Sequence, residues 1–233
     1  ATDYLAFRMA IQPVLDQAVG VLGDRSSGLE PERVLPVARD FLREQPRTFA
    51  EIRSHLVGAF PEVNERALGF TVRMQLPLVM APIEHRWSFP ANAGFVLAED
   101  WLGEPLAEGG ATEALALRYL AAFGPASVAD FQTWSGLQRM KTVFEALRPR
   151  LVSFADERGR ELFDLPDAPR PDAETPAAVR YLPEFDNLLL SHADRTRVIA
   201  DEHRNLVYQK GNLRLLSSFL VDGRVAGTWR AVR

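Results

Sequence analysis

The sequence of 233 residues contains no cysteine, which excludes both a disulfide framework and a thiolate metal site. It has no apolar run long enough to span a bilayer and no recognisable signal peptide, so we expect a soluble, cytoplasmic protein without membrane contact. The four histidines lie at no spacing that suits a metal, and we expect no metal site. No phosphate-binding loop, dinucleotide fingerprint or Ser–His–Asp order occurs, and we expect no cofactor.

An excess of positive charge is also lacking, because the net charge is −4. This argues against a strong nonspecific hold on nucleic acid, which depends on neutralising phosphates. The charge is uneven, however. Residues 179–233 hold 9 Lys and Arg against 6 Asp and Glu, a net +3, which leaves −7 for residues 1–178. Any surface that binds nucleic acid should therefore be local and should include the C-terminal part.

What the sequence does contain is a helical pattern within residues 115–165. A Gly-Pro pair ends a first apolar helix, and Ser127 with Asp130 forms a capping box at the start of a second. A third helix has apolar residues at i, i+3, i+4 and i+7 and ends at a proline. Two strand-like segments follow, residues 151–154 and 161–165, separated by a turn that contains glycine. Three helices and a hairpin in this order predict a winged helix, a variant of the helix-turn-helix.

The same order of elements occurs earlier in the chain, so the sequence contains a repeat. Residues 46–52 match residues 125–131 position by position, and the capping box recurs as Thr48 with Glu51. A third helix is expected over residues 64–76. The hairpin expected after it has strands at residues 78–83 and 94–98. We therefore predict an α+β fold with tandem winged helices.

The rest of the chain reads as an N-terminal helix, a connector and a small β-rich module. We expect five segments in all, namely an N-terminal helix that Pro13 kinks or bounds, two winged helices, a proline-rich connector and the β-rich module, over residues 1–29, 30–110, 111–167, 168–178 and 179–233. The N-terminal helix is interpreted as a remnant of, or a linker from, a further winged helix upstream. In the last segment residues 179–191 read as a strand and residues 213–232 as a hairpin around Asp222-Gly223.

Three separated motifs resemble signatures of one family. They lie at residues 118–137, 181–195 and 221–230 and include the strings RYLAAFGPA, YLPEFDNLLLSHADR and VDGRVAGTWR. On these motifs the sequence is identified as a member of the bacterial winged helix DNA-binding domain family that includes the AlkZ-like and YcaQ-like DNA glycosylases. The resemblance covers essentially the whole chain. It implies tandem winged helices closed by a β-barrel-like module, and hydrolysis of the N-glycosidic bond of N7-alkylated purines in alkylated or crosslinked DNA.

The glutamines depart from the family pattern. Family members with this activity carry a Gln-apolar-Gln or Gln-apolar-Asp motif near the N-terminus, which positions the attacking water. None of the seven glutamines here stands in such a motif, so we carry over no catalytic residue, and whether this chain is an enzyme stays open. The glutamines are Gln12, Gln17, Gln45, Gln75, Gln132, Gln138 and Gln209.

The first candidate DNA contacts come from the helix that a winged helix places in the major groove. In the second repeat this third helix should expose Gln138, Arg139 and Lys141 opposite its apolar stripe. The corresponding helix of the first repeat offers Arg66 and Arg73, next to glutamates that weaken the positive field. For both helices an ordinary solvated face is the alternative interpretation.

Further candidates lie in the second wing and in the C-terminal part. Arg158 and Arg160 belong to the wing, where neighbouring glutamates balance their charge. The string HADRTR is the best basic candidate, because His192, Arg195 and Arg197 suit the binding of a phosphate. An internal ion pair between Arg195 and a nearby aspartate is the alternative.

Three functions are compatible with the sequence. The first is a monomeric winged-helix protein of the DNA-repair glycosylase family, which binds double-stranded DNA and acts on alkylated or crosslinked sites. The second is a non-catalytic DNA-binding transcriptional regulator. The third is a protein-interaction module, which the acidic residues 1–178 would allow. A glutamine motif upstream would favour the first, and salt-dependent binding to duplex DNA separates the second from the third.

Overall fold

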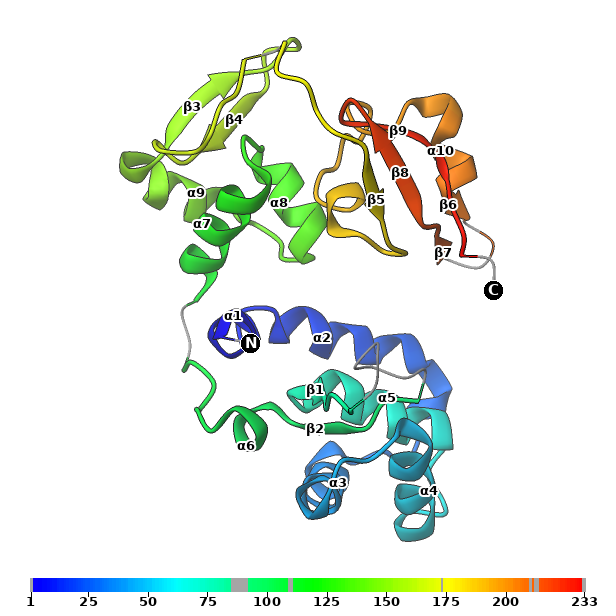
Figure 1. Ribbon diagram of the computed structural model, residues 1–233. Coiled ribbons are helices and arrows are strands. Elements are labelled where there is room, and N and C mark those ends of the chain that lie inside the picture. The colour runs from blue at the N-terminus through cyan, green and yellow to red at the C-terminus, as the bar shows by residue number, and fades with distance from the viewer. Residues whose placement is uncertain are drawn as a thin grey trace. The chain divides into compact units, whose positions relative to one another are not determined.

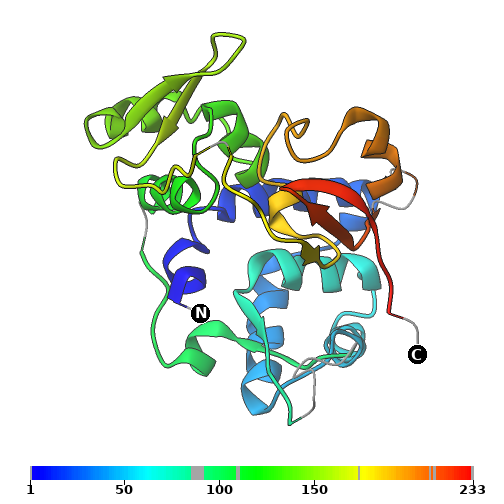
Figure 2. The same cartoon turned by 45° about the horizontal axis from the view of Figure 1, so that its top comes forward.

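The computed structural model describes residues 2–84, 92–108, 111–172, 174–209, 211 and 214–231. The chain is an α+β protein that divides into two compact units, unit 1 over Ala1–Thr112 and unit 2 over Glu113–Arg233 (Figures 1 and 2). Each unit has a hydrophobic core of its own. In the described part of the chain, no helix has the length and apolar character needed to cross a membrane.

Unit 1 begins with two short helices, not with the single N-terminal helix that the sequence predicts. They are α1 (Thr2–Phe7) and α2 (Gln12–Val19), and a 3₁₀ segment, η1 (Gly20–Ser26), follows. Pro13 lies in the first turn of α2, where a residue without an N–H and with a restricted φ is tolerated. Of the two expectations for Pro13, a kink or a boundary, the boundary is therefore confirmed.

The rest of unit 1 consists of three helices, a two-stranded hairpin and a short final helix. These elements are α3 (Pro31–Glu44), α4 (Phe49–Ala59), α5 (Glu65–Gln75), β1 (Leu78–Met80), β2 (Phe95–Leu97) and α6 (Ala98–Leu102). The predicted capping box of α4 is present: Oγ1 of Thr48 accepts from the backbone N–H of Glu51, and the Glu51 carboxylate accepts from the backbone N–H of Thr48. β1 and β2 pair antiparallel, as a hairpin requires.

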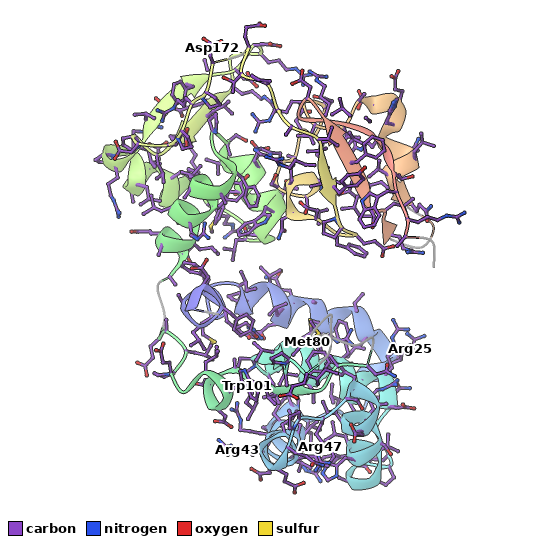
Figure 3. The ribbon with its side chains drawn as sticks, in the orientation of Figure 1. Arg25, Arg43, Arg47, Met80, Trp101 and Asp172 are labelled. Atoms are coloured by element: carbon purple, nitrogen blue, oxygen red, sulfur yellow. The ribbon has the colours of Figure 1, made fainter. Side chains whose placement is uncertain are left out.

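Apolar side chains of these three helices form the core of unit 1. On each helix they recur three or four residues apart, which places them on one face. Buried members include Val34, Ala38, Leu42, Ile52, Leu56, Leu68 and Val72. The exposed Arg43 pairs with Asp100 at 3.3 Å, and the guanidinium of the half-buried Arg47 lies 3.9 Å from the centre of the Phe41 ring (Figure 3 labels the two arginines).

Unit 2 opens with a second group of three helices and a hairpin. These elements are α7 (Thr112–Phe123), α8 (Val128–Ser135), α9 (Lys141–Leu147), the 3₁₀ segment η2 (Arg148–Arg150), β3 (Val152–Ala155) and β4 (Glu161–Asp164). Ser127 and Asp130 form the predicted capping box of α8. Gly136 ends this helix in the left-handed conformation, with a φ of 76°, which glycine adopts at no steric cost. β3 and β4 pair antiparallel.

Aromatic rings fill the core of this helical part of unit 2. Tyr119, Phe131, Phe144 and Phe163 are all buried. From the first to the last, successive ring centroids are 5.4, 5.6 and 5.3 Å apart, within the range of favourable tilted ring pairs. Because one ring comes from each helix and one from β4, this stack ties the hairpin to the three helices.

The C-terminal module of unit 2 contains a helix that the sequence does not predict. Its elements are β5 (Arg180–Leu182), the 3₁₀ segment η3 (Asn187–Leu189), α10 (Asp201–Val207), β6 (Tyr208–Gln209), β7 (Arg214–Leu215), β8 (Ser218–Val221) and β9 (Arg224–Thr228). β8 and β9 form the predicted hairpin around Asp222-Gly223. The strands described in this module form separate sheets, β5-β8-β9 and β6-β7, so they do not confirm a closed barrel.

The strand predicted over residues 179–191 is mostly wrong. Only Arg180–Leu182 pairs in a sheet. The next residue, Pro183, has no N–H to donate to a ladder, and Asp186 then caps η3 by accepting a hydrogen bond from the backbone N–H two residues on. His192 therefore follows a 3₁₀ turn and not a strand.

Candidate nucleic-acid interface

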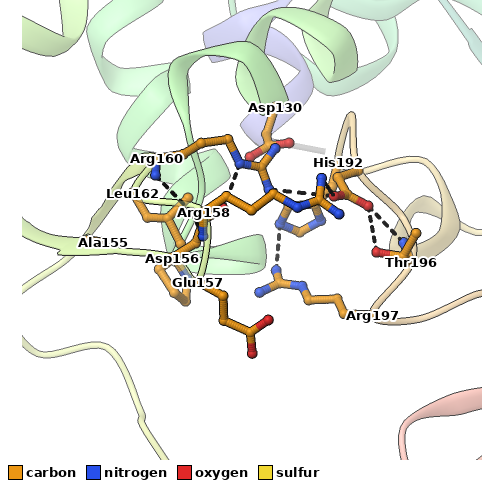
Figure 4. A pocket seen from close by; sticks show the side chains of 12 residues that line it. Asp130, Ala155, Asp156, Glu157, Arg158, Arg160, Leu162, His192, Thr196 and Arg197 are labelled. Carbon is orange, nitrogen blue, oxygen red and sulfur yellow. Dashed lines mark hydrogen bonds and ion pairs between the residues drawn. The ribbon is translucent and has the colours of Figure 1, made fainter.

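Four of the predicted DNA contacts of unit 2 lie around one cavity. Arg158 and Arg160 come from the turn between β3 and β4, and His192 and Arg197 come from the loop after η3 (Figure 4). The cavity has a volume of about 370 Å³. These residues come from two loops that are far apart in the sequence, and the fold of unit 2 brings them together.

Asp156 shapes the hairpin side of the cavity. Its Oδ1 accepts hydrogen bonds from the backbone N–H groups of Arg158 and Arg160 at 2.9 and 2.8 Å, and its Oδ2 accepts from the Arg160 guanidinium at 2.6 Å. These bonds, first of all the one from the Arg160 backbone, hold the pKa of Asp156 below its ordinary value. Gly159, with a φ of 73°, completes the turn. The two arginines are therefore presented by an ordered turn.

Asp194 links the loop to the hairpin. Its Oδ2 lies 3.4 Å from a guanidinium nitrogen of Arg158 and 3.5 Å from one of Arg160. Its Oδ1 accepts from the hydroxyl and the backbone N–H of Thr196, and these bonds, first the one from the hydroxyl, hold the pKa of Asp194 below its ordinary value. The two arginine side chains stay 71% and 47% exposed, so both ion pairs are weak and a competing anion can replace them.

The start of the loop is anchored to α8 through Asp130. This carboxylate serves the capping box, and its Oδ1 also accepts from the backbone N–H of Ala193 at 2.9 Å. Burial acts to raise the pKa of Asp130, but the hydrogen bonds from Ser127 and Ala193 and the charge of His192 outweigh it, so the pKa lies below its ordinary value. The carboxylate therefore stays ionised at neutral pH and holds the loop in place.

His192 lies beside this anchor and is only 7% exposed. Its Nδ1 is 2.8 Å from the hydroxyl oxygen of Ser191, and its Nε2 is 2.8 Å from a guanidinium nitrogen of Arg197. Burial first, and the Arg197 charge second, lower the pKa of His192 below its ordinary value. A neutral, buried imidazole therefore supports an exposed arginine at the edge of the cavity.

Arg195 does not line this cavity. Its guanidinium lies 4.8 Å from the centre of the Tyr208 ring and donates to the Tyr208 hydroxyl, and its Nε donates to the backbone carbonyl of His192 at 3.1 Å. The structure gives Arg195 these partners in place of the aspartate pair, and its DNA contact stays a prediction. The observed partner, Tyr208, lies in β6, and Arg195 holds the loop against it.

The third helix of unit 2 begins later than the sequence predicts. Gln138 and Arg139 lie in the turn before α9, and only Lys141 is in the helix. Gln138 donates to the backbone carbonyl of Gly136 at 3.2 Å, and Arg139 has a positive φ of 60°. All three predicted contacts are exposed, but the expectation that they lie on one helical face is wrong for the first two.

The two candidates of unit 1 are both on α5. Arg66 is in its first turn and Arg73 in its last turn, and both are exposed. The guanidinium of Arg73 lies 4.3 Å from the centre of the Phe49 ring and lines a separate cavity of about 180 Å³. The wing predicted for this unit would include His85 and Arg86, which lie outside the described residues.

Three carboxylates organise the cavity without having been predicted as part of it. They are Asp130, Asp156 and Asp194, and each accepts backbone N–H groups within its own turn. Asp156 and Asp194 could have been identified from the sequence, because an aspartate in a turn often accepts a hydrogen bond from the backbone N–H two residues later. Across the residues that the structure describes, no three His, Asp or Glu side chains converge as a metal site would need.

Comparison with known proteins places the chain in a family. The sequence model of the family described as DNA glycosylase AlkZ-like matches residues 1–233. A curated relative, the interstrand DNA cross-link repair glycosylase of Streptomyces sahachiroi, is 32% identical over 123 residues, which make up 49% of this chain and 32% of the relative.

The solved structure of Streptomyces sahachiroi DNA glycosylase AlkZ resembles this fold with a TM-score of 0.66 at 23% sequence identity. The match covers 88% of this chain and 59% of that one, so the chain spans less than two thirds of the length of the relatives it matches. Because the family model covers every residue, the chain belongs to the AlkZ-like DNA glycosylase family.

Proposed function

We propose that this protein binds double-stranded DNA through the cavity of unit 2, as a DNA-repair glycosylase of its family acting on alkylated or crosslinked DNA. The substrate class rests on family membership and on the name of the Streptomyces sahachiroi relative, an interstrand DNA cross-link repair glycosylase. The DNA-binding role rests on the side chains of the cavity.

The order of elements supports a tandem winged-helix architecture. In each unit three helices precede a two-stranded antiparallel hairpin, and the second helix carries a capping box. In a winged helix the third helix and the hairpin are the elements that approach the duplex. In unit 2 the cavity lies on the hairpin turn, which is where a wing contacts the DNA backbone.

The observation that carries the proposal is the grouping of Arg158, Arg160 and Arg197 around one cavity. Guanidinium groups bind phosphate through charge-assisted, two-pronged hydrogen bonds. The two hairpin arginines are restrained by exposed ion pairs to Asp194, which contribute little in water. A phosphate that enters the cavity replaces one weak anionic partner by a stronger one.

The carboxylates around the cavity do not prevent this exchange. Asp130 and Asp156 are already engaged by several backbone N–H groups, so their charge is spread over local hydrogen bonds. The mixture of positive and negative side chains nevertheless restricts where a phosphate can bind, because the phosphate must lie against the guanidinium groups and away from Glu157. Hydrolysis of the glycosidic bond is assigned to no residue of this chain.

A salt titration of duplex DNA binding tests the proposal. Anisotropy of a fluorescein-labelled duplex would be followed for the wild type and for Arg158→Ala/Arg160→Ala over a series of NaCl concentrations. The double variant should bind more weakly, and its slope of log K against log salt should be shallower by about 0.9 for each phosphate that the variant no longer neutralises.

The matched control is Arg204→Ala/Arg224→Ala, which removes the same charge from exposed positions of unit 2 that do not line the cavity. It should keep a slope close to that of the wild type. Equal decreases in affinity for the two double variants would assign binding to net charge and refute the cavity. Salt-insensitive or absent binding by the wild type would favour a protein-interaction module.

A further inference from the structure

Both ring nitrogens of His192 are engaged, and their partners determine where the proton lies. Arg197 carries only donors, so the contact at Nε2 requires an unprotonated, accepting nitrogen. The proton of the neutral ring must then be on Nδ1. The hydroxyl oxygen of Ser191 accepts it, since that hydroxyl donates its own hydrogen to the backbone carbonyl of Leu188 at 3.0 Å.

The surroundings of the ring favour this neutral form. His192 and Ser191 are buried, with exposed fractions of 7% and 0%. Burial and the Arg197 charge act against protonation of His192, whereas the Asp130 charge and the carbonyls of Phe123 and Pro125 act for it, and the first two prevail. The other charged side chains that face the cavity are Asp156, Glu157, Arg158, Arg160 and Asp194.

We infer that His192 is a positioning residue, which as the Nδ1–H tautomer holds the guanidinium of Arg197 in place to bind a DNA phosphate at the cavity. The inference rests on the proposed DNA-binding function. One end of the guanidinium donates to the imidazole, and the remaining N–H groups are left for the phosphate oxygens. A side chain that is ordered before binding loses less conformational entropy when the phosphate arrives.

This arrangement also explains the difference between the two loop arginines. Arg195 is held by Tyr208 and by a backbone carbonyl, whereas Arg197 is exposed and meets a nitrogen that accepts one hydrogen bond only. The phosphate ligand of the loop is therefore Arg197. Arg195 is structural.

The first test observes the tautomer without DNA. Two-dimensional proton–nitrogen spectra of the full chain labelled with ¹⁵N-histidine would show His192 with a protonated Nδ1 and an unprotonated Nε2 at neutral pH, and His192→Gln would identify its signals. An Nε2–H tautomer or an imidazolium at neutral pH would overturn the inference, whatever the DNA affinity.

The second test measures the affinity of the same labelled duplex in a double-mutant cycle. Arg197→Ala should weaken binding about tenfold, as expected for one hydrogen-bonded charged contact. His192→Met, which has similar length but no comparable acceptor, should show a large part of this decrease, and His192→Gln, which keeps an acceptor, should show less. His192→Met/Arg197→Ala should bind no more weakly than Arg197→Ala alone.

The outcomes distinguish a failure of the positioning role of His192 from a failure of the proposed DNA-binding function. Thermal unfolding of each variant identifies a decrease in affinity that only reflects loss of fold. If Arg197→Ala weakens binding but His192→Met does not, the positioning role is wrong and the DNA-binding function stands. If the wild type does not bind duplex DNA at all, both fail, even where the spectra show the Nδ1–H tautomer.

Discussion

The phenol of Tyr119 donates a hydrogen bond of 2.6 Å to the backbone carbonyl of Ser191, and both residues are buried. Tyr119 lies in α7 and Ser191 lies 72 residues later, directly before the cavity loop. Burial first, and the nearby Asp130 charge second, raise the pKa of the phenol, so it stays protonated and donating. The helical part of unit 2 is thereby joined to the C-terminal module at the residue that supports His192.

We predict that Tyr119→Phe destabilises the protein by about 1–3 kcal/mol, because the buried carbonyl of Ser191 loses its partner while the ring packing stays. The measurement is urea unfolding followed by circular dichroism. Tyr4→Phe is the matched control, since the Tyr4 hydroxyl also donates to a backbone carbonyl, that of Leu78 at 3.0 Å, but from a partly buried position. Equal destabilisation in the two variants would contradict the special role of the buried bond.

The two capping boxes provide a second comparison. Asp130 and Glu51 occupy the same position of their boxes, but Asp130 is buried and also accepts the N–H of Ala193, whereas Glu51 is exposed. Asp130→Ala should therefore cost about 1–3 kcal/mol, since it leaves a backbone donor of the loop without its acceptor. Glu51→Ala should cost less. Urea unfolding of both variants checks the order, and a larger destabilisation by Glu51→Ala would refute it.

The stability of unit 2 should depend on pH through His192. Its folded-state pKa lies below the ordinary 6.5, so the unfolded chain takes up the proton first as the pH falls. The stabilisation is complete above about pH 6.5 and is lost as the pH falls through the folded-state pKa. Asp130 stays ionised over this interval, because its pKa lies below its ordinary value.

The comparison is between the wild type and His192→Gln, whose side chain does not titrate. From about pH 7.5 to about pH 5.5 the urea midpoint of the wild type should fall further than that of the variant. The other histidines are the same in both proteins, so any effect of theirs cancels in the difference. Parallel curves would show that His192 is not held neutral by its surroundings.

Local patterns in the sequence were sufficient to predict those features that depend on contacts between residues close in the chain. Both capping boxes lie where Thr48 and Ser127 predict them, because each box depends on two residues three positions apart. The Asp222-Gly223 hairpin is also present, since this dipeptide suits a tight turn between strands. Such features depend little on the rest of the fold.

The cavity could be predicted only in part, because long-range packing decides which side chains meet. The sequence offered Arg195 and Arg197 together as phosphate ligands, but it could not show that Arg195 donates to the hydroxyl of Tyr208, thirteen residues later. It also assigned a strand to residues 179–191, where apolar side chains fill the core of the module from a 3₁₀ turn. Apolar runs of this length do not distinguish a strand from a buried turn.

Gly124 provides a final prediction about the packing under the cavity. A Cβ at this position would lie 2.6 Å from the backbone carbonyl of Leu120 and 2.4 Å from Oδ1 of the buried Asp164. Gly124→Ala should therefore destabilise the protein by about 1–3 kcal/mol. Gly58→Ala in α4 meets nothing within 4 Å and should stabilise it by about 0.5–1 kcal/mol, as alanine favours a helix. Thermal unfolding measures both, and a neutral Gly124→Ala would show that α7 and β4 are less tightly packed than the structure has them.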